Sequence, residues 1–265
     1  MTGILNIQFQ SVLGNKEINL ERVEGYIKTN KDKPLDLVVL PEFFSTGIDH
    51  QAFVDSPEDT NGGETIGFIR ELAKKYNTNI IAGSIIEKSD DKLYNTSFII
   101  DRTGKILDKY RKIHLFNYLG GTEGERITAG DRQVVVDFDF GKVGVGICYD
   151  IRYPLHYKNL VKSGAEIVVL PTAWIVADEI FNDTSALKSA QDLWVAINRT
   201  RAFDNLVYTV SCNQWGNKCI GKSLVVAPSG MVLSDAENNQ GGFYTDIDLD
   251  IVKAYKSIYP ISHID

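Results

Sequence analysis

A cysteine stands where an apolar run of this chain ends. Residues 143–148 read Val-Gly-Val-Gly-Ile-Cys, so Cys148 closes a segment that is typical of a buried strand. A strand that breaks at this point is expected to carry the thiol into a loop beside a cleft. A thiolate is a strong nucleophile, but a cysteine with an ordinary pKa of about 8.5 is mostly protonated at neutral pH and needs a base or a cation beside it.

Two further segments offer such partners. Glu42 follows the apolar run Val-Val-Leu-Pro at positions 38–41, and Lys112 follows another strand-like run. A carboxylate held near a thiol can take its proton, and an ammonium group can stabilise negative charge that develops on a carbonyl oxygen. Each of these residue types alone is ordinary in a core or a loop. The three together indicate a cysteine hydrolase.

The histidines are weaker candidates for the base. The four of them are His50, His114, His156 and His263, and none lies in a segment typical of a Cys/His catalytic pair. His114 stands close to the lysine, where we expect it to order the loop. Because the sequence lacks Cys-x-x-Cys, His-x-x-x-His and similar ligand spacings, we do not expect a metal site.

Short segments rich in β-branched residues and bounded by Gly, Pro, Asn or Asp recur along the chain. They predict strands at residues 5–9, 36–40, 79–84, 96–101, 105–111, 134–138, 142–148, 166–170, 207–212, 223–227 and 242–247. Apolar residues recur at helical spacing in residues 20–27, 66–76 and 193–197. This alternation predicts an α/β fold. A hairpin signal at residues 102–104, Arg-Thr-Gly, adds an antiparallel pair and predicts mixed sheets.

The run Val-Val-Leu-Pro occurs twice, at residues 38–41 and 168–171. Continuous apolar strands must be covered on both faces, which suits a layered fold with two similar halves. Because proline ends each run, Glu42 and Thr172 are expected beyond the carboxyl edges of neighbouring strands, where open α/β sheets gather their chemistry.

Composition narrows the class of protein. The 265 residues are 43% hydrophobic and 24% charged, and no stretch has the composition of a linker, so we expect one domain spanning residues 1–265. A net charge of -7 argues against a nucleic-acid partner. The first residues lack the parts of a secretion signal, and no apolar run reaches membrane-spanning length. Three sparse cysteines suit a reducing compartment, so we expect a cytoplasmic protein.

Three blocks of sequence carry a family resemblance. Residues 40–44 read Leu-Pro-Glu-Phe-Phe, residues 110–116 read Tyr-Arg-Lys-Ile-His-Leu-Phe, and residues 146–154 read Gly-Ile-Cys-Tyr-Asp-Ile-Arg-Tyr-Pro. In this order they resemble the signature blocks of the nitrilase superfamily of carbon–nitrogen hydrolases, in particular its omega-amidase and deaminated-glutathione-amidase branch. The resemblance implies a four-layer α-β-β-α sandwich with two mixed sheets and, by analogy, a homodimer or higher homo-oligomer.

The resemblance also implies roles for the three residues. Glu42 would be the general base, Lys112 would stabilise the tetrahedral oxyanion, and Cys148 would be the nucleophile that accepts the acyl group. The backbone amide of Tyr149 would complete the oxyanion site. No metal or organic cofactor is required by this chemistry.

A second glutamate is part of the family pattern, seven residues before a Gly-Asp or Gly-Asn pair. Glu123 stands seven residues before Gly130, which Asp131 follows, so it is expected to orient Lys112 or the attacking water. Glu125 is its rival, because the glycine-rich stretch at residues 120–124 makes this part of the alignment the weakest.

The residues next to the blocks are expected to shape the substrate pocket. Tyr149, Trp174 and Phe116 are candidates for its lining, since pockets are commonly lined by aromatic side chains. Asp150 and Arg152 are expected to fix the turn after the cysteine through polar contacts.

The chain departs from the family pattern at two positions. Lys222 stands where relatives often carry a histidine, and Asp204 stands where a glutamate is common. Both departures are expected to alter the subunit interface or the pocket rather than the three reacting groups.

The implied reaction is hydrolysis of a non-peptide C–N bond in a small linear amide, through a thioester, to a carboxylic acid and ammonia. Dicarboxylic acid monoamides are candidate substrates. N-carbamoyl amine hydrolase, aliphatic amidase and nitrilase activities are alternatives within the same chemistry. Isochorismatase-like hydrolases also use cysteine, lysine and a carboxylate, but the early aspartate that they need is not evident. A catalytically silent binding scaffold is the alternative of another class.

Overall fold

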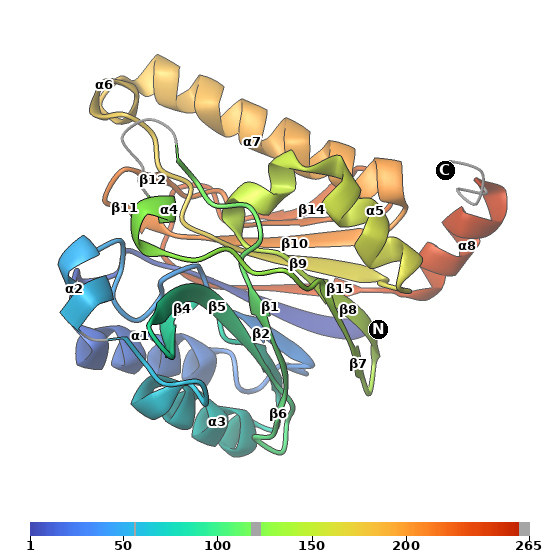
Figure 1. The fold of residues 1–265 in the computed structure, drawn as a ribbon. Coiled ribbons are helices and arrows are strands. Elements are labelled where there is room, and N and C mark those ends of the chain that lie inside the picture. Colours follow the sequence, from blue (N-terminus) through green and yellow to red (C-terminus); the bar gives the residue numbers. More distant parts are fainter. Residues whose placement is uncertain (56, 118–122, 260–265) are drawn as a thin grey trace.

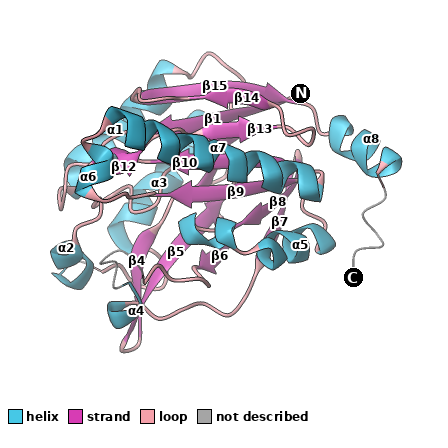
Figure 2. Cartoon of the chain, turned by 90° about the horizontal axis from the view of Figure 1, so that it is seen from above, coloured by secondary structure: helices cyan, strands magenta, loops and turns pink. Residues whose placement is uncertain are grey.

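Two β-sheets lie face to face in the computed structural model, and helices cover the outer face of each sheet (Figures 1 and 2). The structure describes residues 1–55, 57–117 and 123–259. The four layers from one face to the other are helices, sheet, sheet and helices, as the sequence predicted.

The first sheet contains seven strands and is mixed. Its order is β15-β1-β2-β3-β5-β4, with β6 pairing on β5. The strands are β1 (Thr2–Gln8), β2 (Leu37–Val39), β3 (Asn79–Ile81), β4 (Ile85–Ser89), β5 (Lys92–Ile100), β6 (Ile106–Arg111) and β15 (Gly241–Ile247). β1, β2 and β3 run parallel, whereas the β5–β6 pair is antiparallel, so the hairpin predicted at residues 102–104 is confirmed.

The second sheet contains six strands in the order β14-β13-β10-β9-β8-β7. They are β7 (Val134–Phe138), β8 (Gly141–Val145), β9 (Ile167–Thr172), β10 (Tyr208–Asn213), β13 (Leu224–Val226) and β14 (Val232–Asp235). Its central strands β8, β9 and β10 are parallel, and antiparallel strands flank them. A separate two-stranded ribbon pairs β11 (Trp215–Gly216) with β12 (Cys219–Ile220).

The helices connect the strands and cover the sheets. They are α1 (Lys16–Thr29), α2 (His50–Asp55), α3 (Gly63–Tyr76), α4 (Glu123–Arg126), the 3-10 turn η1 (Cys148–Arg152), α5 (Pro154–Lys162), α6 (Asp178–Phe181), α7 (Thr184–Asn205) and α8 (Asp250–Ile258). α1 and α3 pack on the first sheet, and α5 and α7 pack on the second. Within the described ranges, no helix has both the length and the apolar character needed to cross a membrane.

Alternating side chains of the strands explain the four layers. In β2, Leu37 and Val39 point into the core between the sheets, whereas Val38 packs with the residues of α1 and α3. In β9, Ile167 enters the core between the sheets, whereas Val168 packs beneath α5 and α7. Strands that are apolar on both faces can only be buried on both faces, and each fully buried side chain of this kind contributes about 1.5–3 kcal/mol.

Four strands were not predicted, namely β4, β11, β12 and β14. β4 contains Glu87 and Lys88, residue types with low β propensity, and it is held by pairing with β5 across a turn in which Asp90 has a φ of 54°. β11 and β12 are too short for a periodic signal, and β14 is only half buried. Their pairing with neighbours, rather than local preference, decides that they are strands.

Candidate active site

The three reacting groups predicted from the sequence meet at one end of the sandwich. Glu42 follows β2 of the first sheet, Lys112 follows β6 of the same sheet, and Cys148 begins η1 after β8 of the second sheet. All three line one cavity. The site therefore lies where strand ends of both sheets come together, which is where open α/β sheets place their ligands.

Lys112 lies between two carboxylates. Its Nζ atom is 2.9 Å from Oε1 of Glu42, and 3.2 and 2.9 Å from Oε1 and Oε2 of Glu123. The side chains of Lys112 and Glu42 are 2% exposed, and that of Glu123 is 10% exposed. Glu125 is exposed instead. The geometry thus favours Glu123 over its rival, although Gly120 and Gly121 lie outside the described residues.

Asn95 on β5 links the same two carboxylates, and sequence reasoning missed it. Its Nδ2 atom donates to Oε1 of Glu42 at 2.8 Å and to Oε1 of Glu123 at 3.0 Å. The other oxygen of Glu42 accepts from the backbone N–H of Ala173 at 2.8 Å. Every carboxylate oxygen of Glu42 therefore has a donor, which is how a buried carboxylate is kept in one orientation. Asn95 stands directly before the strand predicted at residues 96–101, and nothing local shows that it belongs to the strand or faces the site.

Cys148 has an unusual backbone conformation. Its φ angle is 47°, in the left-handed region that a non-glycine residue occupies at a cost of about 1–3 kcal/mol. The residue is 8% exposed, and the charge of Glu42 acts on its thiol and raises the thiol pKa. β8 ends at Val145, three residues earlier than predicted, so the cysteine stands in the turn and not in the strand.

Burial controls the protonation of these groups. Burial raises the pKa of the Glu42 carboxyl, although Lys112 opposes it. Burial alone would lower the pKa of Lys112, but Glu123 and Glu42 outweigh it and hold this pKa well above its ordinary value. Burial, together with the charge of Glu42, raises the pKa of the Cys148 thiol well above its ordinary value. The resting site therefore holds a protonated lysine and a neutral thiol beside a carboxylate of raised basicity.

The cavity has a volume of about 360 Å³, which suits a small molecule. Phe116, Tyr149 and Trp174, the three aromatic residues predicted to line it, all do so. The rings of Phe116 and Tyr149 meet edge to face with centroids 5.3 Å apart. Further apolar lining comes from residues that were not predicted, which are Phe43, Ile48, Phe53, Ile127, Ala173, Ile175 and Val176.

Three basic residues also line the cavity, and these too were not predicted as lining. Arg126, Arg152 and Lys218 are exposed, in contrast to the buried groups around Lys112. Arg152 was expected to fix the turn through polar contacts, and this expectation is wrong. Its guanidinium lies 5.8 Å from the ring centre of Trp174, and no carboxylate of the described residues is within salt-bridge distance of it.

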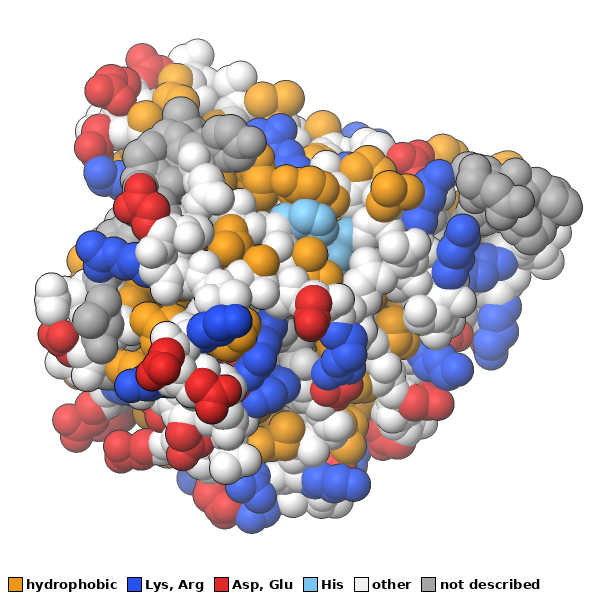
Figure 3. Space-filling view, in the orientation of Figure 1, with side chains coloured by type: hydrophobic (Ala, Val, Ile, Leu, Met, Phe, Trp, Pro, Cys, Tyr) orange, Lys and Arg blue, Asp and Glu red, His pale blue; other side chains and the backbone are white. Residues whose placement is uncertain are grey.

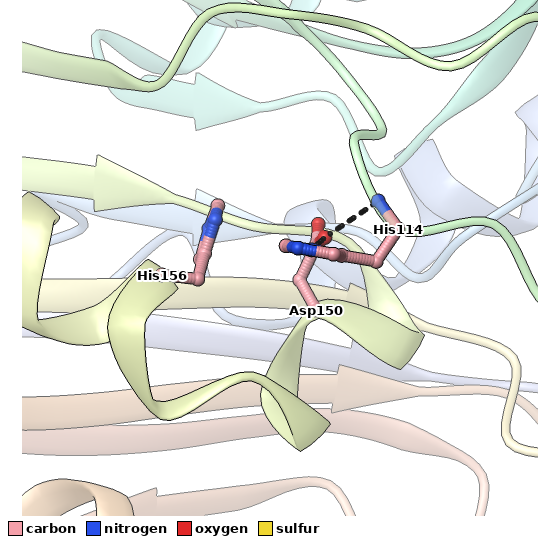
Figure 4. Close-up of side chains that lie close together, drawn as sticks. All are labelled: His114, Asp150 and His156. Carbon is pink, nitrogen blue, oxygen red and sulfur yellow. Dashed lines mark hydrogen bonds and ion pairs between the residues drawn. The ribbon is translucent and has the colours of Figure 1, made fainter.

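Asp150 does fix the turn after Cys148, as predicted, and it forms a cluster with His114 and His156 (Figure 4). Each of the three side chains offers one atom that could bind a metal ion, and these ligand atoms lie within 4.8 Å of one another. However, each oxygen of Asp150 already accepts two hydrogen bonds. Because a carboxylate has about four acceptor positions, this cluster is a hydrogen-bonded one.

The two departures from the family pattern lie away from the three reacting groups. Lys222 is half buried and pairs with Asp235 at 2.8 Å, and Asp204 is exposed on α7. Neither residue lines the cavity.

Comparison with known proteins shows the family of the chain. The carbon–nitrogen hydrolase family profile matches residues 6–257. The omega-amidase NIT3 of Saccharomyces cerevisiae is 30% identical over 273 residues, which cover 97% of this chain and 90% of that protein. The 2-oxoglutaramate amidase of Bacillus subtilis is 29% identical, with 96% of this chain and 94% of that protein covered.

The fold also matches that of a solved structure. The crystal structure of Saccharomyces cerevisiae Nit3, described as a member of branch 10 of the nitrilase superfamily, superposes with a TM-score of 0.87 at 28% identity and covers 99% of this chain and 96% of that one. The four-layer sandwich predicted from the resemblance is confirmed. The chain therefore belongs to the carbon–nitrogen hydrolases of the nitrilase superfamily.

Proposed function

We propose that this carbon–nitrogen hydrolase cleaves a small linear amide through a thioester on Cys148, with Glu42 as the general base and Lys112 as the oxyanion stabiliser. The observation that carries the proposal is the position of all three groups in one cavity, with Glu42 hydrogen-bonded to the ammonium and close enough for its charge to raise the pKa of the thiol. A silent binding scaffold would need none of these contacts.

The first half of the reaction forms the thioester. Glu42 takes the thiol proton while the sulfur of Cys148 attacks the amide carbonyl carbon, and the resulting oxyanion lies beside Lys112 and the backbone amide of Tyr149. The raised pKa of Glu42 suits this transfer, since a base is most effective when its pKa is near the working pH. When the C–N bond breaks, the nitrogen takes the proton from Glu42 and leaves as ammonia.

The second half releases the acid. A water molecule attacks the thioester carbonyl carbon, and its proton passes to Glu42, from which the departing sulfur recovers it as a thiol. Glu123 holds Lys112 from the other side and faces the same cavity. We assign it to orientation of the lysine or of this water. No step consumes a cofactor.

A dicarboxylic acid monoamide is the substrate class that suits the cavity best. Its amide would reach the buried floor near Lys112, its short carbon chain would contact the apolar wall, and its free carboxylate would meet the exposed basic residues, above all Arg152. A guanidinium that has no carboxylate partner among the described residues is a strong hydrogen-bond donor to such an anion. The names of the relatives, an omega-amidase and a 2-oxoglutaramate amidase, support this choice over nitriles and carbamoyl compounds.

We further propose that residues 1–265 act as one domain in a cytoplasmic homodimer or higher homo-oligomer. Support comes from exposed apolar side chains on α5, α7 and the turn between β13 and β14, which are Leu155, Leu193, Phe203 and Met231. All three cysteines are free and buried, in keeping with a reducing compartment. Sedimentation of the purified protein tests the oligomeric state, and a monomer at all concentrations would contradict it.

A substrate panel tests the reaction. Succinamic acid, 2-oxoglutaramate, propionamide, an N-carbamoyl amine and butyronitrile are incubated with the wild-type protein and with Cys148→Ala, and ammonia and acid are measured. We expect the two dicarboxylic monoamides to be hydrolysed fastest and the variant to be inactive. A Cys212→Ala control keeps its activity, because that thiol is buried between the sheets. Preference for the nitrile or the carbamoyl compound contradicts the substrate class, and turnover by Cys148→Ala contradicts the mechanism.

A further inference from the structure

The carboxylate of Asp150 lies between the segment that carries Lys112 and the turn that carries Cys148. It is fully buried, and all four of its hydrogen bonds come from residues adjacent to those two segments. Neither the proposed reaction nor the cavity lining uses this carboxylate. Its contacts divide into a lysine side and a cysteine side.

The lysine side consists of Tyr110 and His114, two residues before and two residues after Lys112. The hydroxyl of Tyr110 donates to Oδ2 of Asp150 at 2.6 Å and accepts from the backbone N–H of Ile113 at 3.2 Å. The backbone N–H and the Nδ1 atom of His114 contact Oδ1 of Asp150 at 3.1 and 2.6 Å (Figure 4). The carboxylate of Asp150 therefore accepts hydrogen bonds from residues on both sides of Lys112.

The cysteine side is the backbone of the turn. The N–H of Ile147 donates to Oδ2 of Asp150 at 2.8 Å, directly before Cys148. The left-handed conformation of the cysteine is unfavourable by itself and persists only where the surrounding structure holds it. The hydrogen bond from the preceding residue is such a constraint.

The charge state of the cluster follows from these contacts. Burial would raise the pKa of Asp150, but the hydrogen bond from His114 and the other donors outweigh it, so the pKa is lowered and the group is ionised at neutral pH. Since an ionised carboxylate only accepts hydrogen bonds, Nδ1 of His114 must carry a proton. The ring of His114 also stacks on Tyr153, with centroids 3.5 Å apart, and histidine side chains reach the surface on this face between hydrophobic ones (Figure 3).

We propose that Asp150 and His114 are positioning residues that set the distance between the nucleophile and the oxyanion stabiliser, an inference that rests on the proposed function. The sulfur of Cys148 attacks, and the ammonium of Lys112 stabilises, the same carbonyl group. The distance between the sulfur and the ammonium must therefore be fixed by contacts that lie outside the cavity. A misplacement of about 1 Å between reacting groups can cost about 100-fold in rate. Asp150 contacts both supports at once.

The test separates the lysine side from the cysteine side. His114→Ala removes the ring from Asp150 but leaves the bond from Ile147 to the carboxylate in place. His114→Asn returns a side-chain donor near the position of Nδ1. The readouts are kcat and KM for succinamic acid, together with the rate at which iodoacetamide alkylates Cys148. Alkylation needs the thiol and its base but forms no oxyanion. It therefore depends on Lys112 only through the charge that lowers the pKa of the thiol and of Glu42, and not on the alignment of Lys112 with a carbonyl oxygen.

For His114→Ala we expect kcat to fall by about 100-fold, KM to change by less than about 3-fold and alkylation to stay within about 3-fold of wild type. His114→Asn should recover at least about 10-fold of the loss in kcat. Gln133→Ala is the matched control, because Gln133 contacts His156 and not Asp150, and it should behave as wild type.

Three results overturn the proposal: a kcat of His114→Ala within about 3-fold of wild type, an equal loss of alkylation and hydrolysis, or no recovery in His114→Asn. If His114→Ala does not fold, Tyr110→Phe takes its place. That change removes only the hydroxyl bond to Asp150 and should lower kcat about 10-fold, the loss expected when one hydrogen bond to a charged group disappears. A wild-type protein that hydrolyses no amide contradicts the proposed function instead.

Discussion

The Nζ atom of Lys112 lies 2.9 Å from Oε1 of Glu42, although 70 residues separate the two along the chain. Both side chains are 2% exposed. A buried ion pair of this kind is costly to assemble, because both charges lose their hydration. Its presence at the floor of a cavity is easier to explain by chemistry than by stability. The same pair therefore leads to predictions on both folding and catalysis.

Removal of the cation should destabilise the fold. Lys112→Met leaves Glu42 and Glu123 buried without their ammonium, and we expect a loss of about 3–5 kcal/mol in the free energy of unfolding. Adding Glu42→Gln removes one of the two uncompensated charges and should recover part of that loss. Urea denaturation at pH 7 measures Lys112→Met, Glu42→Gln and the double variant.

The control for this cycle is Lys222→Met, which breaks the half-exposed pair with Asp235 and should cost less than about 1 kcal/mol. Strict additivity of Lys112→Met and Glu42→Gln would show that the two side chains do not interact energetically, against the prediction.

As the pH falls, protonation of Glu42 should remove the general base at a pH higher than is usual for a glutamate. Glu42 must be ionised to accept the thiol proton, and burial raises its pKa above the ordinary value of 4.5. The sign follows directly: kcat/KM rises as the pH rises through this raised pKa, so activity falls on the acid side above pH 4.5. We expect no matching loss near neutrality from Lys112, whose pKa is raised. Initial rates on propionamide, which does not itself titrate, provide the profile, and an acid midpoint at or below 4.5 refutes the assignment.

Two neighbouring glutamates should behave differently. Glu123→Gln weakens the hold on Lys112 and should lower kcat about 100-fold, in the range typical of a lost acid–base or orienting group. Glu125→Gln is the matched control, since Glu125 is exposed, and should stay within about 2-fold of wild type. Steady-state kinetics decide between them, and a larger loss in Glu125→Gln would reverse the choice.

Asn95 should matter for the orientation of both carboxylates. Asn95→Ala leaves Glu42 and Glu123 each without one buried donor, so we expect kcat to fall at least about 10-fold and stability to fall by about 1–3 kcal/mol. Asn95→Asp should be worse on both measures, because it places a third carboxylate beside the other two. Kinetics and thermal melts rank the variants, and an active, stable Asn95→Asp protein would contradict this account.

Arg152 should select for the free carboxylate of the substrate. Arg152→Met should raise KM for succinamic acid about 10- to 100-fold, equivalent to one hydrogen bond to a charged group, and leave KM for uncharged propionamide within about 3-fold. Arg132→Met is the control, since Arg132 pairs with Asp108 and does not line the cavity. Equal effects on both amides would assign Arg152 to packing rather than to recognition.

Much of the fold could be read from local pattern. β2 and β9 are apolar on both faces, so their sequences alone imply burial between two layers. Pro41 follows the end of β2, but β9 continues through Pro171 to Thr172, so the expectation that the second proline ends its strand is wrong, because pairing with β10 carries the strand past it. β4 could not be read in this way, because the burial of its Glu87 depends on ion pairs with Lys109 and Arg111 of β6 and on a hydrogen bond from Thr96 of β5. Partners on another strand cannot be predicted from the pattern of residue types along β4 itself.

Local sequence pattern was enough to show which residue types follow the strands, and hence that Glu42, Lys112 and Cys148 were the groups to consider. The contacts that hold these groups follow from the packing of segments far apart in the chain. Asn95 reaches Glu42 across 53 residues and the N–H of Ala173 reaches it across 131. The physical reason is that strand identity depends on short-range periodicity, whereas hydrogen bonds between strand ends depend on how two sheets pack.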